Sequence, residues 1–178
     1  MRIGLISDTH VPSMGKEPPA QVLRAFEGVD LILHLGDIYA TFVLDRLERI
    51  APVVGIQAYP DPADPRLKPI QILELEGLVI GMIHNIGAPE TPINTDVGIV
   101  VPPRPPLSEI LTRKFGRPVD IVICGDTHEE LVEEHQGVLF INPGSPTFPG
   151  IKHALGSPGT LAMLEITDGS PSARIIQL

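Results

Sequence analysis

The stretch Arg2-Ile-Gly-Leu-Ile-Ser-Asp-Thr-His10 determines how the rest of the chain is interpreted. Its apolar residues are typical of a buried strand, and they give way abruptly to two potential metal ligands, Asp8 and His10. Open α/β sheets bind their ligands at the carboxyl ends of the strands. We therefore expect Asp8 and His10 to lie at a ligand-binding edge of a sheet.

The same arrangement, an apolar run that ends in potential ligands, recurs along the chain. The ligands at the ends of these further runs are Asp37, His84, and the pair Asp126 and His128. Carboxylate and imidazole groups that converge above a sheet can hold two divalent ions about 3.5–4 Å apart, with one carboxylate between them. We expect Asp37 to be this bridge and assign it the catalytic role.

Composition restricts the class of protein. A chain of 178 residues with 43% hydrophobic and 20% charged residues is typical of one soluble globular domain. The formal charge of -9 argues against general nucleic-acid binding, but it permits a small phosphorylated substrate because metal cations invert the local field. No segment resembles a signal peptide or a membrane span, so we expect a cytoplasmic protein that does not associate with membranes.

The pattern of apolar residues changes between the two halves of the chain. Residues 2–55 alternate between strand and helix patterns, which predicts parallel βαβ units. Residues 119–177 are mostly strand-like, which predicts antiparallel pairing. The helices are predicted over residues 20–26, 40–50 and 108–115. Two packed sheets with helices outside them are therefore expected.

Residues 85–106 contain six prolines and almost no periodicity. A loop of about 20 residues inside a small domain is uncommon. We expect this segment to form a flap on the substrate side of the site.

Other polar residues have simpler interpretations. His34 lies within an apolar strand, and Cys124 lies along another, so both are expected in the core. The four glutamates at positions 129, 130, 133 and 134 are expected to form a solvated edge, and His153 is expected to be exposed.

Taken together, the motifs resemble the calcineurin-like metallophosphoesterase superfamily, and within it the small bacterial and archaeal phosphodiesterases. The motifs that carry the resemblance are Asp8-Thr-His10, Gly36-Asp37, His84, Gly125-Asp-Thr-His128 and Asn142-Pro-Gly-Ser145. The resemblance implies one domain over residues 1–178, with the α/β fold of a four-layer αββα sandwich made of two mixed β-sheets. It also implies two divalent metal ions and the hydrolysis of phosphoesters.

The resemblance assigns the ligands to two ions that share Asp37. The first ion is held by Asp8, His10, Asp37 and His128, and the second by Asp37, His84 and position 126. Asn142-Pro-Gly-Ser145 is expected to be a structural loop beneath the metals. Manganese is the expected metal, and magnesium, nickel, zinc and iron are alternatives.

Two departures from the family pattern fall on the second ion. Position 126 is Asp where the family has His, and Gly55-Ile56-Gln57 stands where the family has Gly-Asn. Gln57 and Asp61 remain open as replacement oxygen ligands. An aspartate at position 126 favours a hard, oxygen-preferring ion such as manganese or magnesium.

Two main functions remain open at this point, beside a third, a mononuclear or regulatory metal-binding protein. The first is a metal-dependent phosphoesterase, more specifically a phosphodiesterase, that uses a binuclear site to activate water. The alternative is a catalytically weakened scaffold acting through protein–protein contacts, as the retromer subunit that resembles this family does. The departures at the second ion and the proline-rich segment favour the alternative. A homo-oligomer is compatible with both.

Overall fold

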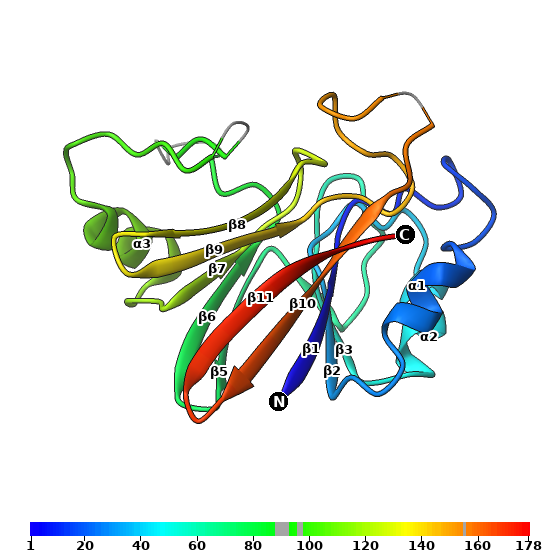
Figure 1. The fold of residues 1–178 in the computed structure, drawn as a ribbon, viewed down its shortest axis with the longest axis horizontal. Coiled ribbons are helices and arrows are strands. Elements are labelled where there is room, and N and C mark those ends of the chain that lie inside the picture. The colour runs from blue at the N-terminus through cyan, green and yellow to red at the C-terminus, as the bar shows by residue number, and fades with distance from the viewer. Residues whose placement is uncertain (88–92, 96–97, 155) are drawn as a thin grey trace.

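The computed structural model describes residues 1–87, 93–95, 98–154 and 156–178. Two mixed β-sheets pack face to face, with α1 and α2 outside one sheet and α3 outside the other (Figure 1). Three separate apolar cores fill the three interfaces between these layers. The predicted α/β class and the four-layer αββα arrangement are therefore confirmed.

The first sheet has the strand order β11-β10-β1-β2-β3-β4. Its strands are β1 (Arg2–Ile6), β2 (Leu31–His34), β3 (Val53–Ile56), β4 (Leu67–Lys68), β10 (Thr160–Thr167) and β11 (Ser170–Gln177). Strands β1 to β4 run parallel, and β10 pairs antiparallel with both β1 and β11. The short strand β4 was not predicted, because it has only two residues and lies among prolines.

The second sheet has the strand order β5-β6-β7-β9-β8. Its strands are β5 (Ile70–Leu75), β6 (Leu78–Ile83), β7 (Ile121–Ile123), β8 (Glu130–His135) and β9 (Val138–Pro143). The central strands β6, β7 and β9 are parallel, and the edge strands β5 and β8 are antiparallel. The prediction of antiparallel pairing throughout the last third was wrong, because β7 and β9 join a second set of parallel strands.

The helices are α1 (Ala20–Ala25), α2 (Phe42–Glu48) and α3 (Leu107–Phe115). They confirm the three predicted helices, with differences of one or two residues at the ends. In the described part of the chain, no helix is long and apolar enough to cross a membrane.

The predicted flap at residues 85–106 is described only in part. Ile86, Ile93 and Ile99 are buried in the core that also contains α3. Residues 88–92 and 96–97 lie outside the described residues, so the flap as a whole stays a prediction.

Two glycines allow a helix layer to approach its sheet closely. A Cβ atom on Gly4 of β1 would lie 2.7 Å from the ring of Phe26, which follows α1. On the other side of the molecule, a Cβ atom on Gly81 of β6 would lie 2.8 Å from the ring of Phe115 at the end of α3. Each aromatic ring thus occupies the space that a side chain would fill in the strand.

We expect Gly81→Ala to lower the free energy of unfolding by about 1–3 kcal/mol, the usual cost of overpacking a core. Urea titration followed by circular dichroism measures this change. Combining it with Phe115→Leu, which makes room for the new methyl group, should cost less than the sum of the two single changes. Strict additivity would contradict the close contact between Gly81 and Phe115.

Candidate metal centre

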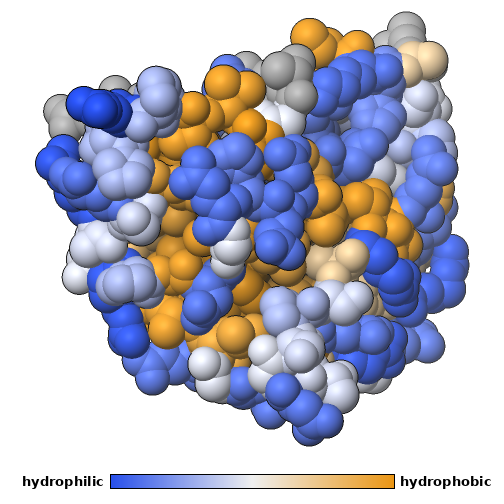
Figure 2. All heavy atoms as spheres, turned by 60° about the vertical axis from the view of Figure 1, so that its left-hand side comes forward, coloured by the Kyte–Doolittle hydropathy of each residue, from blue (hydrophilic) through white to orange (hydrophobic). Residues whose placement is uncertain are grey.

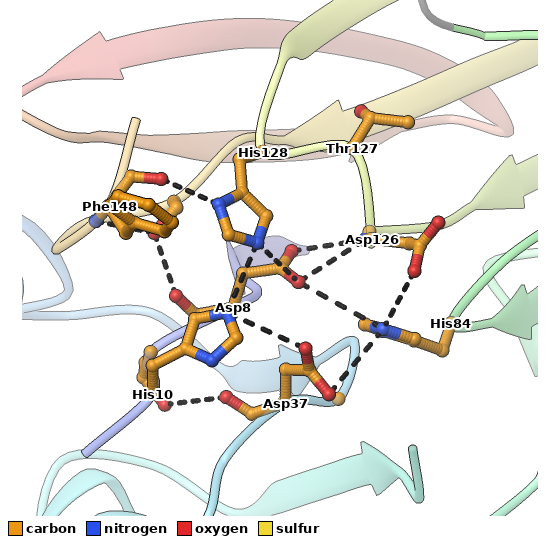
Figure 3. A network of polar contacts seen from close by, with 12 residues as sticks. Asp8, His10, Asp37, His84, Asp126, Thr127, His128 and Phe148 are labelled. Atoms are coloured by element: carbon orange, nitrogen blue, oxygen red, sulfur yellow. Dashed lines mark hydrogen bonds and ion pairs between the residues drawn. The ribbon is translucent and has the colours of Figure 1, made fainter. Parts of the chain in front are cut away.

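The six residues predicted as ligands lie together at the carboxyl ends of parallel strands (Figure 3). Asp8 and His10 follow β1, Asp37 follows β2, His84 follows β6, and Asp126 and His128 follow β7. Strands of both sheets therefore contribute to one site. In each sheet the residues lie at the carboxyl ends of the strands, where open α/β sheets bind their ligands.

The loops that carry these residues have a strained backbone. Left-handed φ angles occur at Asp8 (52°), His10 (46°), Asp37 (54°), Asp126 (72°) and His128 (60°). Residues other than glycine rarely adopt this conformation, although Asp and His tolerate it better than most. Such strain persists only where the surrounding structure enforces it, and it gathers at functional sites.

Asp8, His10, Asp37 and His128 form the first ligand group. Their candidate donor atoms all lie within 4.8 Å of one another. The Nε2 atoms of His10 and His128 are 3.1 Å apart, and His128 Nε2 lies 3.5 Å from Asp8 Oδ1. His10 Nε2 lies 3.5 Å from Asp37 Oδ2. Two carboxylates and two imidazoles thus face one small volume.

Hydrogen bonds to backbone carbonyls set the protonation of two histidines. His128 Nδ1 lies 2.7 Å from the carbonyl oxygen of Phe148, and His84 Nδ1 lies 2.7 Å from that of Leu35. A carbonyl only accepts, so Nδ1 carries a proton in both rings, and in the neutral form of each ring the lone pair lies on Nε2. This backbone anchoring is typical of histidines that bind metals through Nε2.

The imidazole nitrogens and carboxylate oxygens of the centre therefore carry more lone pairs than the available protons can pair in hydrogen bonds. Burial lowers the pKa of His10 to about 4, with smaller contributions from His128 and His84, so its ring is neutral at pH 7. Asp37 Oδ1 is buried and accepts no hydrogen bond from any described residue. Lone pairs and carboxylate oxygens that face each other repel unless a cation lies among them. The residues of the first ligand group fit a divalent metal ion on this test.

Asp37, His84 and Asp126 form the second ligand group. His84 Nε2 lies 3.6 Å from Asp37 Oδ1 and 3.5 Å from Asp126 Oδ1. Asp126 is more open than the other ligands, with 41% of its side chain exposed. Its Oδ2 atom accepts a 2.6 Å hydrogen bond from Asn85 Nδ2, a neighbour that the sequence did not reveal. The second ligand group is thus assembled, but it is smaller than the first.

The loop after β3 holds neither Gln57 nor Asp61 among the ligands. The Asp61 carboxylate accepts hydrogen bonds of 2.7–3.0 Å from the amides of Ile38, Tyr39 and Ala58, which use both of its oxygens. The Gln57 side-chain amide donates to the Asp61 carbonyl oxygen at 3.4 Å. A Cβ atom on Gly36 would lie 3.0 Å from the Ala58 methyl group and 2.8 Å from His84 Nδ1. Gly36 thus lies between close neighbours from two loops, the Ala58 methyl group and the His84 ring.

The end of β9 and the loop that follows it support the backbone of the candidate ligands. Asn142 Nδ2 donates to the Gly125 carbonyl oxygen at 2.9 Å, and Ser145 Oγ donates to the Asp8 carbonyl oxygen at 2.7 Å. The expected structural role of this loop is consistent with these bonds. His34 is fully buried beside the site, with Nε2 3.2 Å from Thr9 Oγ1, as predicted for a core histidine.

Two aromatic rings near the centre were not predicted. The ring of Tyr39 meets His10 edge-on, with the centroids 4.8 Å apart. The ring of Phe148 lies 5.2 Å from that of His128 and 6.4 Å from that of His10. Both residues lie in irregular loops, where periodicity gives no signal.

Two simpler interpretations were wrong. Glu129 is buried rather than solvated, and its Oε1 atom accepts a 2.9 Å hydrogen bond from the amide of Lys152. His153 is partly buried, and its Nε2 atom lies 2.8 Å from Glu130 Oε2. The segment after Ser145 folds back over these glutamates, a long-range contact that local sequence does not encode.

Burial makes the Asp8 carboxylate costly in the metal-free protein. Desolvation raises the pKa of Asp8 to about 6 from its ordinary 3.8, although His84 and His128 oppose the shift. A raised pKa means that the folded state binds the proton more tightly than the unfolded state. The contribution of Asp8 to stability is therefore lost as the pH rises through about 6.

Asp8→Asn removes this charge, so without metal the variant should be more stable than the parent protein at pH 7.5. We expect a gain of roughly 1–3 kcal/mol at pH 7.5, since one pKa unit corresponds to about 1.4 kcal/mol, and little gain at pH 4. Urea unfolding in EDTA measures the difference. Adding Mn²⁺ should stabilise the parent protein and not the variant. Lower stability of Asp8→Asn at pH 7.5 in EDTA would contradict the assigned cost.

The chain is similar to several known proteins. The chain is 36% identical over 151 residues to a probable metallophosphoesterase of Methanocaldococcus jannaschii. The matched region covers 84% of this chain and 70% of that protein. A phosphodiesterase of the same organism is 28% identical over 158 residues, covering 81% and 83%. The fold matches Vps29 of Entamoeba histolytica in complex with zinc, with a TM-score of 0.70, 22% identity and 99% of each chain covered. The family model of the calcineurin-like phosphoesterase superfamily domain matches residues 1–169, and the chain belongs to that superfamily.

Proposed function

We propose that this protein is a metal-dependent phosphodiesterase with two divalent ions. The observation that carries the proposal is the convergence of two carboxylates, the neutral His10 ring and His128 Nε2 in the first ligand group. Membership of the phosphoesterase superfamily and similarity to a protein named phosphodiesterase support the reaction class.

Each side chain has a role that follows from its contacts. Asp8, His10 and His128 would hold the first ion, and His84 and Asp126 the second. Asp37 would bridge them, because its two oxygens face His10 and His84 separately. Divalent ions supply charge neutralisation for a phosphoryl group and promote ionisation of water. Hydrolysis adds water across one P–O ester bond and yields an alcohol and a phosphomonoester.

The charge of the site favours a diester over a monoester. Asp8, Asp37 and Asp126 offset most of the charge of two divalent ions and leave about +1. The described residues that line the two cavities beside the centre include no lysine or arginine. A diester carries one negative charge, whereas a monoester carries nearly two at pH 7. The diester is therefore the better match.

The donor atoms also bear on the metal. Asp126 replaces an imidazole with a carboxylate in the second ligand group, and carboxylates suit manganese and magnesium. Imidazoles in the first ligand group suit manganese better than magnesium, which binds mainly through oxygen. Manganese is accordingly the proposed metal.

The scaffold alternative would use an exposed surface. Figure 2 shows the side of the second sheet and α3, where hydrophobic and hydrophilic residues are interleaved. Exposed apolar side chains of that sheet include Ile70, Ile72 and Val132, each about two-fifths exposed. Either a partner or a second copy of the chain could contact such a surface. The complete first ligand group nevertheless favours the hydrolase.

Asp37→Ala tests the proposed function most directly. With Mn²⁺, the parent protein should hydrolyse bis(p-nitrophenyl) phosphate faster than p-nitrophenyl phosphate and should bind two ions per chain. Loss of the shared ligand should reduce both the metal content and, by at least about 100-fold, the hydrolysis. Asp45→Ala, which removes an exposed carboxylate of α2, is the control. Unchanged hydrolysis in Asp37→Ala would refute the assignment.

Asp126→His tests the charge argument. An imidazole in place of the carboxylate raises the charge of the site by one, so hydrolysis of the dianionic monoester should gain about tenfold relative to the diester. The ratio of kcat/KM for p-nitrophenyl phosphate and bis(p-nitrophenyl) phosphate is the measurement. An unchanged ratio, with metal content preserved, would show that charge does not select the substrate.

A further inference from the structure

A cavity of about 560 Å³ opens beside His128 and Asp126. It lies between the loop after β1 and the segment after β9, and its walls include Met14, Phe148 and Ile151. This volume is in the range of cavities that bind small organic molecules. We call it the apolar cavity.

Its walls expose large apolar side chains. Met14 is 43% exposed, Phe148 is 51% exposed and Ile151 is fully exposed. Single exposed apolar residues are common on protein surfaces, but several around one cavity mark a binding site. Their position next to the candidate metal centre indicates that the occupant is part of the same ligand.

Phe148 is fixed relative to the metal ligands at three points. Its carbonyl oxygen accepts from His128 Nδ1 at 2.7 Å, and its ring meets the His128 ring in a T-shaped contact. Its amide donates to Ser145 Oγ at 2.9 Å, and the same hydroxyl donates to the Asp8 carbonyl oxygen. An aromatic wall is thus held at a defined distance from the place where the phosphoryl group would bind.

A second cavity of about 360 Å³ has the opposite character. Asn85, Thr95 and other polar residues line it, and Asp126 and Thr127 belong to both cavities. The two sides of the site therefore offer an apolar and a polar environment. This asymmetry suits a phosphodiester with two different ester groups.

Charge further restricts the occupant of the apolar cavity. Asp126 lines it, and the His153 ring in its wall is bonded to Glu130. Among its described lining residues there is no lysine or arginine, so a second phosphate would be repelled. Phe and Met side chains favour the faces and edges of aromatic rings.

We propose that the apolar cavity binds an uncharged aromatic ester group of the phosphodiester substrate and that Phe148 and Met14 select it. The inference rests on the proposed function, because the phosphoryl group of the same molecule must lie at the candidate metal centre. Phe148 and Met14 are specificity residues and take no part in bond breaking.

The test compares methyl(phenyl)phosphinate with dimethylphosphinate. Both are monoanions without an ester bond, so neither can be hydrolysed, and they differ only by a phenyl ring in place of a methyl group. Isothermal titration of the Mn²⁺-loaded protein should give a Kd about tenfold lower for the phenyl compound, as expected for burial of the ring.

Phe148→Ala and Met14→Ala should each reduce this difference severalfold, measured as the ratio of the two Kd values within the same variant. Val132→Ala, which removes an exposed apolar side chain of β8, should leave the difference intact. Equal Kd values in the parent protein, or a full difference in Phe148→Ala, would overturn the inference. Absence of bis(p-nitrophenyl) phosphate hydrolysis by the parent protein would refute the proposed function. Equal Kd values with this hydrolysis present would refute only the inference about the apolar cavity.

Discussion

The contact between the loops that follow β1 and β7 is the constraint on which the site depends. The Asp126 amide donates to the Asp8 carboxylate at 3.1 and 3.3 Å, which joins the first sheet to the second. The preceding residue must be glycine, because a Cβ atom on Gly125 would overlap the Ser7 hydroxyl and lie 2.9 Å from Asp8 Oδ2. Without this close approach, the ligands of the two sheets would not share one volume.

The centre is nevertheless costly in the metal-free protein. Asp8 is fully buried, and five of the six candidate ligand residues have left-handed backbones. Strain and desolvation of this kind persist only where other interactions offset them. The three apolar cores and the hydrogen bonds from Asn142 and Ser145 provide that support. A bound cation would remove the remaining electrostatic penalty.

Prediction from the sequence succeeded where the signal was local. The apolar runs before Asp8, Asp37 and His84 identified strands, and their polar ends identified residues that the structure brings together. It failed where the answer required distant contacts. Asp61 was considered as a possible metal ligand, but its carboxylate accepts hydrogen bonds from three backbone amides. Glu129 was expected in solvent, but a later segment buries it.

The sequence by itself determined the fold class, the candidate ligands and the family resemblance, because each depends on residue types at fixed spacing. Only the tertiary structure decided which nitrogen of His84 and His128 faces the centre, and that Ala58 and His84 both pack closely against Gly36. It also placed Phe148 at the wall of the apolar cavity. These features arise from contacts between segments far apart in the chain, such as the hydrogen bond from Ser145 to Asp8. No local pattern encodes them.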